Sequence, residues 1–239
     1  MTRLRTLTRM ALHEMWISFR LIAVVGLPML GGILVIGLPP EFGGVTAIGG
    51  AAFWYAIVAG AAICVASGVA AGTMAHERRR GTVAWMAVRA VPRAAVLFSW
   101  FVAIGLLLTV GIAVGSIGAW LAALTHAESP PDVVPFAAAL VATVGASLAA
   151  VALGLLIGAV LRPLPAVLVA LVLTGAVLAA AILQPAGGLL LPTGGIGLLS
   201  HLDALVRPIS GALESTGVAL AVAALLLAAA GAVLERSDL

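Results

Sequence analysis

Charged residues are scarce in this 239-residue chain, and lysine is absent from it. Only 9% of the residues are charged, whereas 63% are hydrophobic, and the mean hydropathy is +1.25. This composition excludes a domain that stays in solution. The absence of lysine excludes a P-loop nucleotide site, because that motif places a lysine beside the phosphates. The single cysteine, Cys64, excludes a disulfide framework within the chain, and we interpret it as a small apolar filler.

Apolar residues dominate what is present, and they are grouped into long runs. Six runs of roughly 18 residues or more contain no Asp, Glu, Lys, Arg or His, which predicts six membrane-spanning helices. We therefore expect an all-α, polytopic integral membrane protein that forms a single domain over residues 1–239. The runs are Leu21–Leu38, Gly50–Thr73, Leu97–Leu124, Val134–Leu161, Leu164–Gln184 and Thr216–Leu234.

The arginines indicate an orientation. If the N-terminus is cytoplasmic, eleven of the twelve basic residues fall on the cytoplasmic side and only Arg207 lies outside, as the positive-inside rule requires. Both termini are then cytoplasmic. The pI near 10.4 reflects arginine kept at the membrane surface and does not indicate a nucleic-acid partner. The exclusive use of arginine, with abundant Ala and Gly, is typical of a GC-rich prokaryotic genome, so we expect a prokaryotic cytoplasmic membrane.

Two further segments have a distinctive pattern. Residues 1–20 carry apolar side chains at helical spacing and charged ones between them, which predicts an amphipathic helix in the headgroup plane. It serves as a topology anchor or as a lever to a cytoplasmic partner. Residues 185–215 are apolar but rich in Gly and Pro, which predicts short re-entrant helices on the external side. Within them Asp203 and Arg207 are spaced to pair on one helical face, either as a surface ion pair or as an external gate contact.

The segment 75–96 is longer than a turn between two spans requires. It begins with Glu77, Arg78, Arg79 and Arg80 and continues into apolar residues that have no role in spanning the membrane. Such residues fit a groove in a partner protein, whereas a purely basic loop would only fix topology. We therefore predict a cytoplasmic coupling loop. Its expected contact residues are Glu77, Arg78, Arg79, Arg80, Gly81, Thr82, Trp85 and Met86.

A family resemblance rests on this loop. The run from Glu77 to Thr82, directly after the second span and followed by an apolar stretch, Pro92 and Arg93, resembles the membrane subunits of ATP-binding-cassette exporters of the type-2 permease family. The end Leu234–Leu239 is similar to the basic-Asp-Leu finish of that family. The chain departs from the pattern at Ala84, where the family often has Glu, and Pro92 lies about two residues later than usual.

The resemblance implies a permease subunit that is not itself an enzyme. Two copies, or two related subunits, would pair in the bilayer, and each would insert its coupling loop into a separate cytoplasmic ATPase subunit, which binds the ATP. The chain would hold no cofactor and no metal. Its uncharged spans favour an apolar or amphipathic substrate, exported with energy from ATP. For the seam between copies, the small residues near Gly26, Gly31 and Gly32 and the outer end of the fifth span are both candidates.

Other classes of function are also compatible with some of these features. A non-transporting regulatory or assembly protein would show the same spans and loop. An intramembrane hydrolase would use Ser116, which lies in a Gly-Ser-Ile-Gly sequence, but no histidine occurs within the spans to activate it. An ion-coupled transporter usually needs acids within the membrane, and the six runs contain none.

Overall fold

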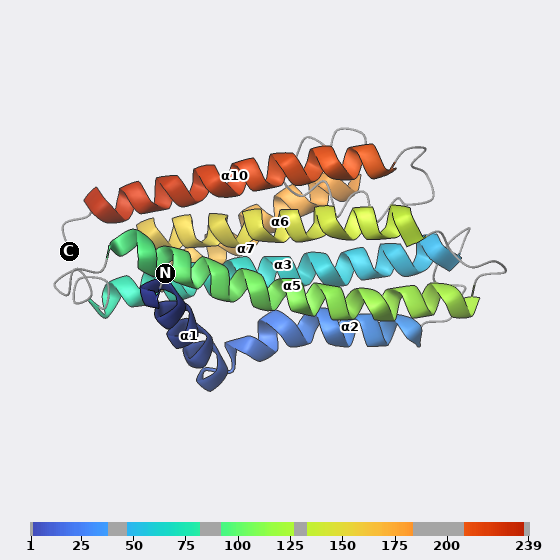
Figure 1. The fold of residues 1–239 in the computed structure, drawn as a ribbon, viewed down its shortest axis with the longest axis horizontal. Helices are drawn as coiled ribbons and strands as arrows, with labels where there is room; N and C mark the ends of the chain where they lie inside the picture. The colour runs from blue at the N-terminus through green and yellow to red at the C-terminus, as the bar shows by residue number, and fades with distance from the viewer. Residues whose placement is uncertain (1, 38–46, 82–91, 127–132, 184–207, 237–239) are drawn as a thin grey trace.

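The structure is a computed structural model that describes residues 2–37, 47–81, 92–126, 133–183 and 208–236. Within these ranges it is all-helical, with no strand, and the long helices lie side by side in one bundle (Figure 1). A short π-helix, η1, stands between the first two α-helices. The elements are α1 (Thr2–Ile17), η1 (Ile22–Gly26), α2 (Leu27–Ile36), α3 (Ala47–Arg79), α5 (Arg93–His126), α6 (Val133–Val160), α7 (Pro163–Leu183) and α10 (Pro208–Arg236).

Five of these helices, α3, α5, α6, α7 and α10, are long and apolar enough to cross a membrane. Their length and composition are compatible with the multi-pass membrane protein that the apolar runs predict. The sixth predicted span, Leu21–Leu38, corresponds to η1 and α2, which together cover Ile22–Ile36. That segment is shorter than the roughly 20 residues that a bilayer core requires. It is long enough to cross a membrane only if α1 is counted with it, and the two segments meet at a bend of 82°.

The bend between α1 and η1 is made by a residue in a left-handed conformation. Phe19 has φ 57°, which is uncommon for a bulky side chain. Ser18 ends α1 by donating from both its backbone N–H and its hydroxyl to the carbonyl of Glu14, at 3.0 and 2.7 Å. The N–H of Ile22 then bonds to the carbonyl of Phe19 at 3.1 Å, which begins the next helical segment. The predicted amphipathic segment is therefore a separate helix, which lies oblique to the long helices at one end of the bundle (Figure 1).

Glycine residues allow the backbones of α2 and α5 to come into direct contact. A Cβ at Gly32 would collide with the backbone of Gly115, and a Cβ at Gly118 would collide with the backbone of Gly32. Gly31 is equally enclosed, because its Cβ would collide with Val58 of α3. Gly31 and Gly32 thus make close contacts inside the chain, and their part in a seam between two copies stays a prediction, as does the alternative seam at the outer end of the fifth span.

A second glycine contact joins α6 to α3. A Cβ at Gly154 would collide with the carbonyl oxygen of Ser67, and a Cβ at Gly158 would collide with that of Ala71. These two small residues, spaced four apart, let the backbones of α6 and α3 approach closely. The central position belongs to α3, which packs against α2, α5, α6 and α7, whereas α10 packs mainly on α6. Only 28% of the spanning window of α7 and 22% of that of α10 are buried, so these two helices form the open side of the bundle.

The helices extend beyond the apolar runs that predicted them. The second run ends at Thr73, but α3 continues to Arg79, and α5 begins at Arg93, four residues before its run. Similarly, α10 begins at Pro208, so residues 208–215 belong to a long helix and do not form a separate re-entrant element. Proline is well suited to the first turn of a helix, where its missing N–H has no partner to lose. Residues 184–207, which include the rest of that predicted segment, lie outside the described residues.

Candidate functional site

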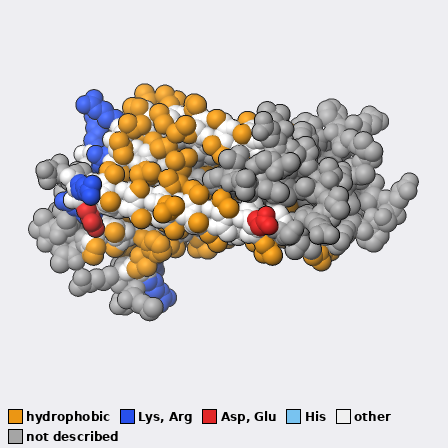
Figure 2. Space-filling model, turned by 90° about the horizontal axis from the view of Figure 1, so that it is seen from above, with side chains coloured by type: hydrophobic (Ala, Val, Ile, Leu, Met, Phe, Trp, Pro, Cys, Tyr) orange, Lys and Arg blue, Asp and Glu red, His pale blue; other side chains and the backbone are white. Residues whose placement is uncertain are grey.

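One end of the bundle carries the positive charge. The arginines that the structure describes belong to α1, to the turn after it, or to the ends of the long helices that meet on the left of Figure 1. The space-filling view shows basic side chains at this end only, and hydrophobic side chains over most of the remaining described surface (Figure 2). The sequence predicts such a gathering, because it places eleven of the twelve arginines on one side of the membrane. Arg89 and Arg207 lie outside the described residues.

The predicted contact motif begins as the last turns of α3. The N–H of Arg80 still bonds to the carbonyl of His76 at 2.9 Å, while the N–H of Gly81 bonds to that of Arg78 at 3.1 Å. Gly81 has φ +71°, and a Cβ there would meet nothing within 4 Å. Glycine is therefore needed for its backbone conformation, which ends the helix, and not for space. The chain can leave the helix axis at this residue.

The side chains of the motif divide into a buried and an exposed set. Glu77 is only 5% exposed, and Arg78 is partly buried, whereas Arg79 and Arg80 are exposed. Arg79 and Arg80 can therefore reach a partner protein, while the carboxylate of Glu77 lies within the bundle. Thr82, Trp85 and Met86 lie outside the described residues, so their predicted contacts stay predictions.

Three arginines at this end form hydrogen bonds from one helix or turn to another. Arg20, in the turn after α1, donates from Nη1 to Oγ1 of Thr73 on α3 at 2.8 Å. Arg93, at the start of α5, donates to the carbonyl of Leu234 on α10 at 2.7 Å. Arg78 donates to the carbonyl of Gly158 on α6 at 3.4 Å, which is long for a charged donor. The helix ends on both sides of segment 82–91 are thereby joined to three other parts of the bundle.

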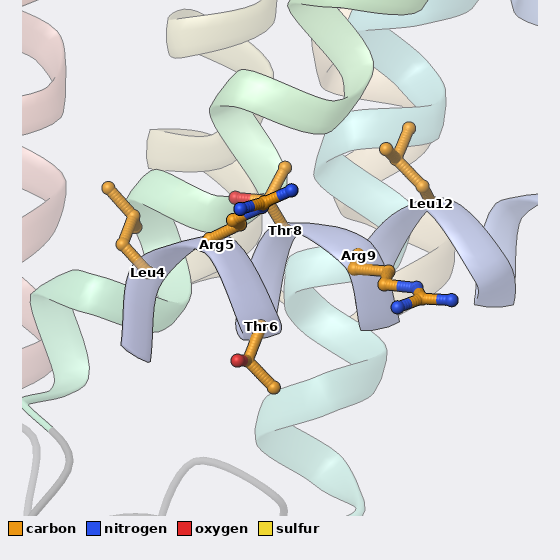
Figure 3. Close-up of a pocket in the computed structure, with 6 residues that line it drawn as sticks. All are labelled: Leu4, Arg5, Thr6, Thr8, Arg9 and Leu12. Atoms are coloured by element: carbon orange, nitrogen blue, oxygen red, sulfur yellow. The ribbon is translucent and has the colours of Figure 1, made fainter. Parts of the chain in front are cut away.

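The amphipathic helix α1 is joined to the same end by its apolar face. Ala11 and Met15 are buried in the cluster that also contains Met74, Leu97 and Trp100, and α1 packs on α5. Figure 3 shows Leu4 and Leu12 on one side of α1 and Thr6 on the other, along an open cavity of about 690 Å³. Part of the apolar side of α1 therefore packs on the bundle, whereas Met10, Trp16 and Ile17 of the same helix are exposed, and the predicted place of the helix in the headgroup plane stays a prediction.

The depression between three of the long helices is apolar and open to the outside. A cavity of about 540 Å³ lies between α5, α6 and α10, and its polar groups are the hydroxyls of Thr109, Ser116 and Thr216. Each of these hydroxyls donates to a carbonyl of its own helix, at 2.8, 2.6 and 2.7 Å respectively. Their hydrogen bonds are thus satisfied locally. A molecule in this cavity would meet mainly aliphatic surface.

A hydrolase site and an external gate gain no support. The bond from Ser116 to the carbonyl of Ala113 and the packing of Gly115 and Gly118 on α2 give the Gly-Ser-Ile-Gly sequence a role in helix contact. Asp203 and Arg207 lie outside the described residues. Within the part of the chain that the structure describes, no three His, Cys, Asp or Glu side chains lie together as metal ligands.

Comparisons with protein-family models, with curated proteins and with solved structures found no match to this chain. Its function is therefore argued from its own residues. The sequence located the charged end and the motif of α3, but the hydrogen bonds made by Arg20, Arg78 and Arg93 were not predicted. No local pattern encodes them, because their partners lie 53 to 141 residues away in the sequence.

Proposed function

We propose that this chain is the membrane-spanning permease subunit of an ATP-binding-cassette exporter, with segment 77–86 as its contact with a separate ATPase subunit. The proposal rests on how the arginine-rich end of the bundle is built. A topology signal requires only positive charge on one side of the membrane. Here the motif forms a rigid helix end whose exposed residues, Arg79 and Arg80, precede an apolar segment with Trp85 and Met86.

The hydrogen bonds between the helix ends would transmit a movement of this contact to the rest of the bundle. Segment 82–91 lies between α3 and α5 in the sequence, and Arg20 and Arg93 join those two helices to α1 and α10. Arg78 joins the same helix end to α6. A displacement of the segment by an ATPase would therefore reach α3 and α5 directly and, through these bonds, the turn after α1, α6 and α10. Glu77, being buried, has a positioning role at the end of α3, and the exposed Arg79 and Arg80 begin the contact surface of segment 77–86.

The complete transporter contains two permease copies in this proposal, with α2 and η1 as part of a sixth span. The open sides of α7 and α10 provide the pairing surface, since the glycines of α2 are already used within the chain. The apolar cavity between α5, α6 and α10 favours an apolar or amphipathic substrate. The membrane is the cytoplasmic membrane of a prokaryote, with both termini on the cytoplasmic side.

Assembly with an ATPase tests the proposal. The full chain is co-expressed with an ATP-binding-cassette ATPase of its own genome, the complex is purified, and ATP hydrolysis is measured in reconstituted membranes. Trp85→Ala removes the aromatic anchor and should weaken the complex by at least ~2 kcal/mol, or roughly thirtyfold. Trp120→Ala is the matched control, because Trp120 packs on Phe136 near the opposite end of α5 with ring centroids 5.4 Å apart. Equal assembly and hydrolysis in wild type and Trp85→Ala would leave the loop as a topology device.

A further inference from the structure

A cationic cavity lies beside the end of α3 and shares Arg78 and Arg79 with the segment proposed to contact the ATPase. It has a volume of about 590 Å³ and lies between α3 and the turn that joins α6 to α7. Its charged lining consists of three arginines, Arg78, Arg79 and Arg162, and the other residues that line it are apolar. No carboxylate belongs to this described lining, so three positive charges gather without a counterion in the cavity. Such a gathering favours a bound anion.

Arg78 is held in place at this cavity and has a donor to spare. Its Nη1 donates to the carbonyl of Gly158 in the last turn of α6, where carbonyls lack helical partners. Its Nε is buried and has no hydrogen-bond partner among the described residues. A buried unpaired donor is costly, and satisfying it with an anion from the cavity would require the side chain to shift, because this atom is closed to solvent. The planar guanidinium is also the group best matched to the oxygens of a phosphate.

The start of α7 contributes the positive end of a helix dipole to the cavity but few hydrogen-bond donors. Pro163 and Pro165 occupy two of its first three positions and have no N–H, and the N–H of Ala166 is already bonded to the carbonyl of Arg162 at 2.9 Å. The usual set of backbone donors for an anion at a helix N-terminus is therefore absent. The positive end of the helix dipole still favours negative charge, and the hydrogen bonds must come from the arginines.

The surroundings of the cavity identify the kind of anion. Val160 at its edge is 57% exposed, and Leu164 and Leu168 on the adjacent outer face of α7 are 73% and 54% exposed. A charged group in the cavity is thus next to apolar surface that faces the bilayer. Anionic phospholipids combine a phosphate with acyl chains in this arrangement, and basic pockets between spanning helices bind their headgroups. We propose that the cavity of Arg78, Arg79 and Arg162 binds the phosphate headgroup of an anionic phospholipid, whose acyl chains lie along α7.

The test measures lipid preference in the full chain, purified in a neutral detergent. Native mass spectrometry gives the relative affinity for phosphatidylglycerol and phosphatidylcholine with the same acyl chains. The wild type should prefer phosphatidylglycerol, and Arg79→Gln with Arg162→Gln should each reduce that preference about fivefold. Both side chains are exposed, so neither change disturbs the packing. Arg236→Gln is the matched control, because Arg236 is an exposed arginine at the same end of the bundle but does not line the cavity.

The lipid preferences of the wild type and the three variants decide whether the cavity binds the headgroup. A preference that falls in the two cavity variants and persists in Arg236→Gln supports the site. Equal affinity for the two lipids in the wild type overturns it, and so does an equal loss in all three variants, which would indicate general surface charge. Inorganic phosphate alone provides the last arm: if it displaces phosphatidylglycerol as well as a second anionic lipid does, the site takes free phosphate and the lipid assignment is wrong. The proposal does not depend on an ATPase partner, so its failure and that of the proposed function are separable.

Discussion

The hydrogen bond between Arg20 and Thr73 gives the sharpest stability prediction, because it joins the turn after α1 to α3. Arg20 is partly buried, Thr73 is 1% exposed, and the two atoms lie 2.8 Å apart. A hydrogen bond with a charged partner contributes about 1.5–3 kcal/mol. The partial exposure of Arg20 reduces this value, so we expect a coupling free energy of roughly 1–2 kcal/mol between the two side chains.

A double-mutant cycle isolates that coupling. Arg20→Met keeps the apolar stem and removes the donors, and the hydroxyl of Thr73 can then bond to a carbonyl of its own helix, so the loss is small. Thr73→Val keeps the shape and leaves the partly buried guanidinium without its partner, which costs roughly 1–3 kcal/mol. The free energy of unfolding is measured in mixed micelles for the wild type, both single variants and the double variant.

The matched control replaces Arg9, which is exposed on α1, in place of Arg20. Arg9→Met and Thr73→Val should be additive, since no hydrogen bond joins them. Additivity within about 0.5 kcal/mol for Arg20→Met and Thr73→Val as well would refute the reasoning. The turn after α1 would then lie on α3 without an energetic link, and α1 could not act as a lever.

Two glycine substitutions test the packing and the helix end. Gly154→Ala should lower the free energy of unfolding by about 1–3 kcal/mol, because the added methyl collides with the carbonyl of Ser67; Gly217→Ala, with nothing within 4 Å, should be neutral or slightly stabilising in the same assay. Gly81→Ala should cost about 1–2 kcal/mol through its positive φ alone, and a cost no larger than that of Gly231→Ala, another glycine in open space, would show that this conformation is not required.

The sequence predicted the helices well because a bilayer imposes a simple rule on composition. Apolar runs of sufficient length mark spans, and five of the six predicted runs became long helices. Their ends were predicted less well, since charge ends the membrane-buried part of a helix but not the helix itself. Residues such as Ala75, Glu77 and Arg78 are good helix formers, so α3 continues past Thr73.

The arrangement of the helices could not be predicted, because it depends on which small residues meet. The spacing of Gly154 and Gly158 indicated a close contact but not that α3 would provide the other side. The same limit applies to Gly31 and Gly32, whose small size suits a contact within the chain as well as one between copies. The left-handed turn at Phe19 had no sequence signal, since glycine or asparagine is expected there.

Only part of the candidate site could be predicted from the sequence, because the rest depends on how the helices pack. The charge and the glycine of Glu77–Gly81 are local features, and the sequence identified them. The burial of Glu77 and the cavity that adds Arg162 to Arg78 and Arg79 arise from the packing of α3 against α6 and α7. These contacts are far apart in the sequence, so only the three-dimensional structure shows them.

Site-directed cross-linking tests the central claim most directly. Cys64 is the only cysteine, so Cys64→Ala gives a background in which one new thiol can be placed at will. With the ATPase co-expressed and a short thiol-to-amine cross-linker added, Met86→Cys should form an adduct of permease and ATPase. Leu121→Cys, 46% exposed near the opposite end of α5, should form none. An adduct at Met86→Cys but not at Leu121→Cys is the predicted result, whereas no adduct at Met86→Cys in an assembled complex, or equal adducts at both positions, would contradict the claim that segment 77–86 contacts the ATPase.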